Sequence, residues 1–225
     1  MLRGKGLLTP IQRAFLAVFS GLPDQEHFYL TGGTCLAEFY LGHRLSQDLD
    51  LFTGEGELIL PFSYRLETTV RSGGLAITVI RRFASFVEFL VGRGEEQVRV
   101  DLALDAPLRF EPPLLSEYGI WTNSRPDLLA DKVLAYFGRA EPRDAVDLYF
   151  LLQEENLDRL LDMAARKDPG FDLYWFAVAL NRAADFPDEL ERWPVQMRRP
   201  FAPRDLKATF QRLALDLMER ITARK

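Results

Sequence analysis

The chain has 225 residues, of which 48% are hydrophobic, so it is long enough to bury a core. Its formal net charge of −5 argues against a uniformly basic nucleic-acid-binding protein. The one cysteine and two histidines exclude an internal disulfide and a Cys/His zinc cluster. Residues 2–8 lack the apolar core of a secretory signal and no later run has membrane-spanning length, so we expect a cytoplasmic protein without a membrane partner.

The first half of the chain is expected to alternate helices and strands. Thr9, Pro10 and Gln12 form a capping box that predicts a helix to about Ser20. The segment from Phe28 to Thr53 follows. Apolar periodicity and glycine turns then predict a helix over 61–71, strands over 75–83, 85–91 and 98–104, glycine turns at 73–74 and 92–94, and a connector over 112–123.

The segment 28–53 reads FYLTGGTCLAEFYLGHRLSQDLDLFT and predicts a strand, a glycine turn, a short helix and a second strand. Adjacent glycines let the backbone approach a ligand, and a positive φ at Gly33 would serve that approach. The amide groups at the start of the helix would face a phosphate. Gly32, Gly33 and Thr34 are therefore candidate nucleotide-binding residues.

Acidic residues give this segment a second feature. Asp48 and Asp50 are two apart on the second predicted strand, so their carboxylates project from the same face. Two parallel carboxylates bind a hard divalent cation such as Mg²⁺, which bridges the phosphates of a nucleotide. Asp101 lies among apolar neighbours in VRVDLALD, where its side chain either faces water or takes part in a site.

From Ser124 onward the composition is helical. A capping box at 124–127 predicts a helix to about Phe137, with Gly138 as its terminator. Further helices are expected from Glu141, over 157–166, over 172–184, and from about Arg204 to Arg224. We therefore expect an α+β domain over residues 1–123 and a helical subdomain over residues 124–225 that closes the cleft of the first.

Polar residues lie at unusual positions on two of these helices. Lys132 falls on the inward side between Leu128 and Tyr136, where its ammonium either escapes to solvent or neutralises phosphate. Asp144 and Asp147 are three apart and share one face of the next helix.

These motifs together resemble the AbiEii/AbiGii-type nucleotidyltransferase toxin family, within the polymerase-β-like nucleotidyltransferase superfamily. The resemblance spans about Phe28 to Leu152 and begins with LTGGTCLAEFYLGHRLSQDLDLF. DLLADKVLA is similar to the lysine motif of the family. RDAVDLYFLL resembles its last motif, in which an arginine and two aspartates follow the lysine helix.

The resemblance implies a polymerase-β-like fold, a small mixed sheet with flanking helices, followed by a C-terminal helical bundle. It also implies a third metal carboxylate, for which Asp101 matches and Asp105 is the alternative. Asp48, Asp50 and Asp101 would hold two Mg²⁺ ions, or Mn²⁺, and Asp101 would also serve as the base for the acceptor hydroxyl. The residues implied to bind nucleotide in the second half are Lys132, which also takes a catalytic part, Arg143, Asp144 and Asp147. Which of the two aspartates contacts substrate and which fixes the lysine or the arginine stays open.

The resemblance further implies transfer of a nucleotide from a nucleoside triphosphate to an acceptor hydroxyl, with the tRNA 3′ end as acceptor. The protein would be the toxin of a type IV toxin–antitoxin or abortive-infection pair, with a cognate antitoxin as partner. Two other readings stay open: a small-molecule nucleotidyltransferase of the antibiotic-modifying type, and a catalytically idle module that binds a nucleotide or a partner.

The basic charge is concentrated at the end of the chain. Residues 192–225 hold nine Lys or Arg against three acids, a net charge of +6, so the remaining residues carry −11. This segment is either a solvated helix face or a surface for a polyanion such as RNA. Its candidate RNA contacts are Arg198, Arg199, Arg204, Lys207 and Arg212.

Overall fold

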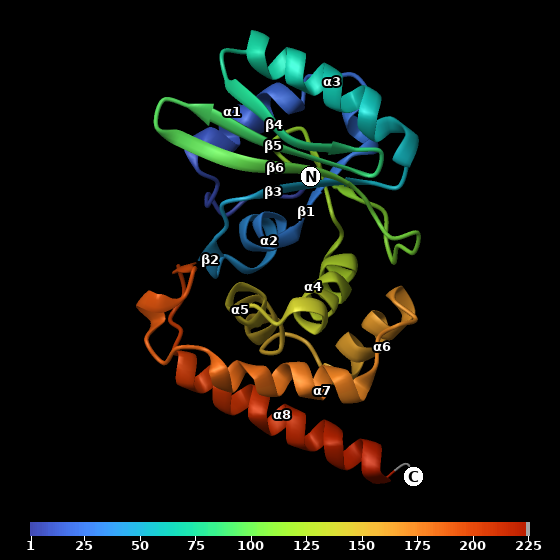
Figure 1. The fold of residues 1–225 in the computed structure, drawn as a ribbon, viewed down its shortest axis with the longest axis vertical. Helices are drawn as coiled ribbons and strands as arrows, with labels where there is room; N and C mark the ends of the chain where they lie inside the picture. The colour runs from blue at the N-terminus through green and yellow to red at the C-terminus, as the bar shows by residue number, and fades with distance from the viewer. Residues whose placement is uncertain (224–225) are drawn as a thin grey trace. The chain divides into compact units, whose positions relative to one another are not determined.

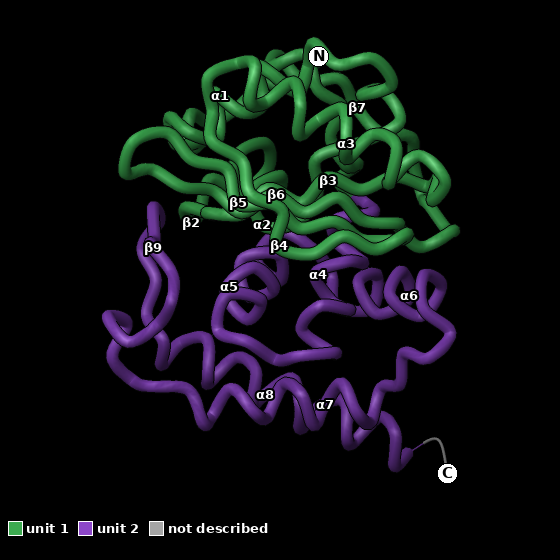
Figure 2. The backbone as a smooth tube through the Cα atoms, turned by 45° about the horizontal axis from the view of Figure 1, so that its top comes forward, with its two compact units in different colours: residues 1–125 green, residues 126–225 purple. Residues whose placement is uncertain are grey.

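A computed structural model describes residues 1–223, and the chain divides into two compact units, residues 1–125 and residues 126–225 (Figure 2). The first unit contains all seven strands of the main sheet, and the second contains most of the helices. Among the described residues, no helix is both long and apolar enough to cross a membrane.

The first unit is built on a mixed sheet with the strand order β4-β5-β6-β3-β1-β8-β7 (Figure 1). Strand β3 is parallel to β6, and β1 is parallel to β8, while the other neighbours are antiparallel. The strands are β1 (Tyr29–Thr31), β3 (Leu49–Thr53), β4 (Ala76–Phe83), β5 (Phe86–Arg93), β6 (Glu96–Leu104), β7 (Leu114–Leu115) and β8 (Trp121–Thr122), with β2 (Arg44–Leu45) outside this sheet. The predicted mixed sheet is confirmed.

Helices α1 (Pro10–Phe19) and α3 (Gly56–Ser72) cover one face of this sheet (Figure 1). The predicted capping box of α1 is present, with the Thr9 side chain accepting from the Gln12 amide and the Gln12 side chain accepting from the Thr9 amide. Phe62 of α3 stacks on Phe28 with ring centroids 4.2 Å apart. Phe62 also packs edge-on against Phe19 of α1, with ring centroids 5.7 Å apart, so the apolar sides of both helices are buried as amphipathic periodicity predicts.

The predicted secondary structure of two segments in the first unit, 56–71 and 112–123, was wrong. Helix α3 begins at Gly56 rather than at Pro61, because the burial of Ile59 and other apolar side chains outweighs the hydrogen bond that an internal proline removes. The expected connector over 112–123 contains β7 and β8, which are too short for alternation of residue types to reveal. The other strand predictions hold to within about two residues at each end.

The second unit is helical, as predicted. Its α-helices are α4 (Arg125–Arg139), α5 (Pro142–Leu151), α6 (Leu157–Lys167), α7 (Leu173–Asn181) and α8 (Pro203–Ala223), and the first residue of α4 belongs to the first unit. The second unit also contains the short helices η3 (Arg182–Asp185) and η4 (Leu190–Arg192) and the strand β9 (Gln196–Met197). The short helix η1 (Gln25–His27) lies in the first unit. Gly138 does not end α4, which runs to Arg139 and is followed by Ala140 at φ 48°. The predicted end of the last helix, at Arg224, lies outside the described residues.

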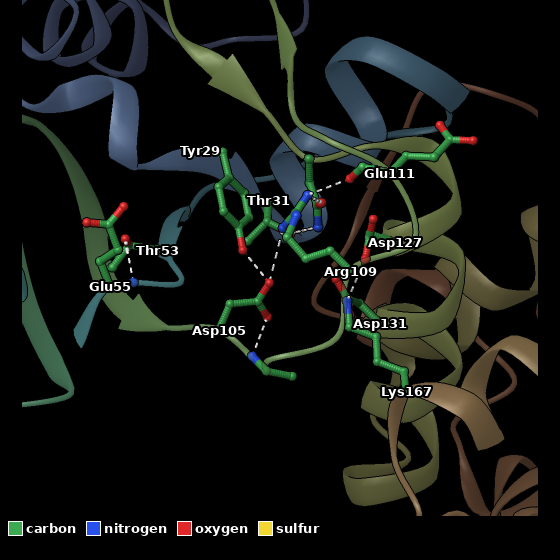
Figure 3. Close-up of polar contacts among 12 residues, drawn as sticks. Tyr29, Thr31, Thr53, Glu55, Asp105, Arg109, Glu111, Asp127, Asp131 and Lys167 are labelled. Atoms are coloured by element: carbon green, nitrogen blue, oxygen red, sulfur yellow. Dashed lines mark hydrogen bonds and ion pairs between the residues drawn. The ribbon is translucent and has the colours of Figure 1, made fainter.

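A buried lysine joins two helices of the second unit. The Nζ of Lys167, on α6, lies 2.6 Å from Oδ1 of Asp131 and 3.2 Å from Oδ1 of Asp127, both on α4 (Figure 3). The lysine side chain is 2% exposed, and Asp127 is fully buried. Sequence reasoning assigned Asp127 to a helix cap and did not predict this cluster, because no local pattern relates residues 36 and 40 positions apart.

Candidate active site

Gly32 begins the helix that follows β1, and its backbone has φ +68°. This helix consists of α2 (Gly32–Cys35) and the π-helical segment η2 (Leu36–Leu41). A methyl group on Gly32 would overlap the Oδ2 atom of Asp50. Position 32 therefore requires glycine for two reasons: its backbone is left-handed, and the Asp50 carboxylate lies where a side chain would be. The positive φ expected at Gly33 occurs at Gly32 instead.

Gly33 is close to two polar side chains. A Cβ there would lie 2.7 Å from Nη2 of Arg44 and 2.8 Å from Oγ of Ser46, so Arg44 and Ser46 occupy the space that a side chain would fill. The hydroxyl of Thr34 donates to the backbone carbonyl of Asp48. Thr34 thus fastens the start of the helix to the segment that carries the first predicted metal carboxylate.

Asp50 and Asp101 face one another across parallel strands. They are register partners of β3 and β6, and Thr31 of β1 is the partner of Asp50 on its other side. Register partners on neighbouring strands project from the same face of a sheet, so the two carboxylates share a face. The Oδ1 atom of Asp101 is buried and has no hydrogen-bond partner among the described residues.

This environment raises the pKa of Asp101 to about 7. Burial of the carboxyl group is the largest cause, the charge of Asp50 is the next, and Arg99 opposes them. A carboxyl group held at such a pKa takes and releases a proton near neutral pH.

Asp48, the third predicted ligand, is ion-paired. Its Oδ2 lies 2.7 Å from Nη2 of Arg99, a residue of β6. Within residues 1–223, no three His, Cys, Asp or Glu side chains are arranged as a ready-made metal site. The three-carboxylate metal site therefore stays a prediction, in which Asp50 and Asp101 are already opposite one another and Asp48 would have to exchange its arginine for the metal.

A fourth carboxylate, which sequence reasoning missed, lies beside these three. Glu88 of β5 is the register partner of Asp101 and is 6% exposed. Its Oε2 lies 2.7 Å from Nε of Arg81, on the neighbouring strand β4. A glutamate between apolar residues in FVEFLV was the signal in the sequence that could have revealed it.

Asp105, the alternative third carboxylate, belongs to a separate network (Figure 3). It accepts hydrogen bonds from the Tyr29 hydroxyl and, at 3.2 Å, from Nη1 of Arg109. Arg109 also donates to Oδ1 of Asn123 at 2.8 Å, and Asn123 Nδ2 lies 2.9 Å from the Thr31 hydroxyl. The network braces Thr31, the residue before the glycine turn, which is a structural role for Asp105.

Lys132 and Asp147 form a buried ion pair in the second unit. The Nζ of Lys132 lies 2.8 Å from Oδ2 of Asp147, and the two side chains are 6% and 0% exposed. The ammonium therefore does not reach solvent as a snorkelling lysine would. Of the two aspartates left open by the sequence, Asp147 holds the lysine.

Asp144 holds a different cation. Both of its oxygens accept from Arg139, at 2.5 Å from Nε and 2.7 Å from Nη2. Arg143 lies 3.0 Å from Glu141 through its Nε. Whether an aspartate of this helix also fixes Arg143 stays a prediction, as do the nucleotide-binding roles of Arg143 and Asp144.

Comparison with known proteins decides the family. The model of the family described as nucleotidyl transferase AbiEii toxin, type IV TA system, matches residues 14–221. The chain belongs to this AbiEii family.

Solved structures agree with the AbiEii fold. A protein from H. pylori described as a nucleotidyltransferase has a TM-score of 0.63 at 17% identity, with 96% of this chain and 95% of that chain covered. JHP933 from Helicobacter pylori has a TM-score of 0.63 at 18% identity, with 95% and 91% covered. MenT4, a nucleotidyltransferase toxin from Mycobacterium tuberculosis H37Rv, has a TM-score of 0.57 at 18% identity, with 92% and 81% covered. No curated protein matches the chain.

The basic C-terminal segment of this AbiEii chain is less uniform than its composition indicates. Lys207 donates to the Phe186 carbonyl and lies 2.6 Å from Oδ1 of Asp188, so its ammonium joins parts of the second unit. The guanidinium carbon of Arg199 lies 4.8 Å from the ring centroid of Phe150. Arg198, Arg204 and Arg212 are exposed and are the better candidates for contact with a polyanion, a role that stays a prediction.

Proposed function

We propose that this AbiEii-family chain is a Mg²⁺-dependent toxin that transfers a nucleoside monophosphate from a nucleoside triphosphate to a hydroxyl of tRNA, and that a cognate antitoxin opposes it. One observation carries the proposal. Asp50 and Asp101 are opposed on parallel strands, directly beside a glycine turn that leaves no room for a side chain at Gly32. Such a turn beside two carboxylates suits a metal-bound triphosphate.

The donor set fits a hard divalent cation. Its atoms are carboxylate oxygens, and the buried Oδ1 of Asp101 has no hydrogen-bond partner among the described residues. When bound, a divalent cation at these carboxylates supplies positive charge beside the phosphates and favours ionisation of the acceptor hydroxyl. Asp50 and Asp101 would hold it, together with Asp48 once Asp48 leaves Arg99.

The chain's own residues then have distinct tasks. The turn at Gly32 lets the triphosphate approach the backbone, and Asp101 accepts the proton of the acceptor hydroxyl. The hydroxyl oxygen bonds to the α-phosphorus as the bond from that phosphorus to the bridging oxygen breaks, and pyrophosphate leaves. Lys132, held by Asp147, takes the phosphate-neutralising role that its lysine motif implies.

tRNA is the acceptor that the remaining observations favour. The family is one of toxins, and the exposed Arg198, Arg204 and Arg212 in a net basic segment suit a nucleic-acid backbone better than a small antibiotic. The test is incubation with Mg²⁺, each labelled nucleoside triphosphate in turn, and either total tRNA or an aminoglycoside. We expect label on tRNA alone. Label on the aminoglycoside alone would assign the small-molecule reaction, and label on neither would favour the idle module.

A further inference from the structure

Arg99 lies between two carboxylates of different kinds. Its Nη2 is 2.7 Å from Oδ2 of Asp48, a predicted metal ligand, and its Nη1 is 4.0 Å from Oε1 of Glu88, which no metal prediction includes. Its side chain is 42% exposed, so the guanidinium has room to move. It precedes Asp101 by two residues on β6 and shares its face of the sheet.

Arg99 lies among several acidic residues. Four carboxylates gather on one face of β3, β5 and β6 and at the entry to β3: Asp48, Asp50, Glu88 and Asp101. Arg81 lies beside Glu88 at the outer side of this cluster, and Arg99 lies inside it. Arg99 is therefore a counter-charge of Asp48 when no metal ion is bound.

A divalent cation and the guanidinium compete for Asp48. Two positive groups a few ångströms apart repel in a partly buried site, so a cation that binds Asp48 weakens the hold of Arg99 on it. Glu88 is a second carboxylate with which the displaced Arg99 side chain can pair. Its Oε2 pairs with Arg81, and its Oε1 lies 4.0 Å from Nη1 of Arg99.

We propose that Arg99 is a positioning residue that holds Asp48 in the metal-free protein and moves to Glu88 when a divalent cation binds. The proposal rests on the metal-binding role of Asp48 in the proposed function. It accounts for two observations together: Asp48 is ion-paired with Arg99, and the buried Glu88 is the register partner of Asp101. Arg99 and the cation are then alternative partners of Asp48, and Glu88 makes the exchange easier.

The test measures binding of Mn²⁺ alone, without nucleotide, by electron paramagnetic resonance of the free ion. Arg99→Gln removes the competitor, so its Mn²⁺ affinity should rise about threefold to tenfold, in line with the strength of exposed ion pairs. Glu88→Gln removes the alternative partner of Arg99, so the Mn²⁺ affinity should fall by a similar factor. Arg99→Lys, which keeps the charge but loses the fork that spans two carboxylates, should lie between the parent and Arg99→Gln.

The double variant Arg99→Gln/Glu88→Gln separates this exchange from the direct electrostatic effect of removing the Glu88 charge near the metal site. If Glu88 acts through Arg99, Glu88→Gln has little further effect once Arg99 is absent. An equal loss of affinity in both backgrounds would overturn the proposal, as would weaker Mn²⁺ binding by Arg99→Gln. Arg82→Gln, which breaks the ion pair of Arg82 with Glu67 on the same sheet, is the matched control and should leave Mn²⁺ binding unchanged.

Asp48→Asn distinguishes a failure of the metal-binding role of Asp48 from a failure of the Arg99 exchange alone. If this variant binds Mn²⁺ as the parent does, the metal-binding role of Asp48 fails, and the exchange fails with it. If Asp48→Asn weakens Mn²⁺ binding but Arg99→Gln does not strengthen it, the exchange alone is wrong and the proposed function stands.

Discussion

Lys132 and Asp147 are joined by an ion pair of 2.8 Å in which both side chains are almost fully removed from solvent. A buried ion pair contributes little net stability, because desolvation of the two charges offsets their attraction. Removing one partner is costly, since the other charge is left buried and unpaired. The pair on α4 and α5 is therefore weak evidence for a contribution to stability, and the functional role of Lys132 stays a prediction.

The first prediction follows from this pair. Lys132→Ala should lower the free energy of unfolding by about 3–5 kcal/mol and abolish nucleotide transfer. Lys132→Met with Asp147→Leu should recover most of the stability, because both charges are gone, and should remain inactive. Chemical denaturation and a transfer assay measure the two effects. An active double variant would mean that the lysine serves packing alone.

The second prediction concerns the pH dependence that Asp101 confers. Its folded-state pKa of about 7 lies above the ordinary value of 3.8, so the folded protein binds this proton more tightly than the unfolded chain. The group therefore favours folding at low pH, and this contribution is lost as pH rises toward the folded pKa. Asp101→Asn, which cannot ionise, should melt higher than the parent at about pH 8, with a smaller difference at about pH 5. Equal differences at both pH values would show that the carboxyl group is not perturbed.

The third prediction uses two glycines that share a backbone conformation. Gly32 and Gly74 have φ of +68° and +80°, but a methyl group on Gly32 would overlap Asp50, whereas one on Gly74 meets nothing within 4 Å. Each Ala variant should lose about 1–2 kcal/mol of stability from the left-handed backbone. Only Gly32→Ala should also weaken Mn²⁺ binding, because it displaces the Asp50 carboxylate. Similar Mn²⁺ affinity in the two variants would separate the turn from the metal site.

The fourth prediction tests the RNA surface. If Arg198, Arg204 and Arg212 each contact a phosphate, replacing all three with Gln should reduce the slope of log affinity for tRNA against log salt by about 2–3. A control triple variant at Arg65, Arg71 and Arg93, which belong to the first unit, changes the net charge equally and should leave the slope intact. Nucleotide binding should be unaltered in both. If the two triple variants behave alike, the C-terminal arginines form an ordinary solvated face.

Local patterns predicted the elements around the candidate site. The segment 28–53 contains the predicted strand, helix and second strand, because its apolar runs and its glycines specify these states over a few residues. The helix already begins at Gly32, and the short strand β2 was not predicted. The spacing of Asp48 and Asp50 and the mid-strand position of Asp101 were also readable. That Asp50 and Asp101 are register partners was not, because register depends on pairing between segments about fifty residues apart.

Side-chain partners were the least predictable feature. Lys132 was recognised as inward-facing, yet its choice of Asp147 over Asp144 depends on how α4 and α5 pack. Arg99 gave no signal, since an arginine two residues before an aspartate on a strand is ordinary. Its contact with Asp48 arises only when β3 and β6 are neighbours. Lys207 was counted with the basic surface, but its partners are a carbonyl and a carboxylate about twenty residues away.

Transfer of nucleoside monophosphates to tRNA is tested by the mass of tRNA after incubation with the protein, Mg²⁺ and nucleoside triphosphates, with pyrophosphate determined in the same reaction. The account predicts a mass increase of one or more nucleoside monophosphates at the 3′ end, one pyrophosphate for each, and loss of both products in Asp50→Asn, at least about 10²-fold in rate. A chelator should have the same effect as the variant. Unchanged tRNA mass with a folded parent protein, or full activity in Asp50→Asn, would contradict it.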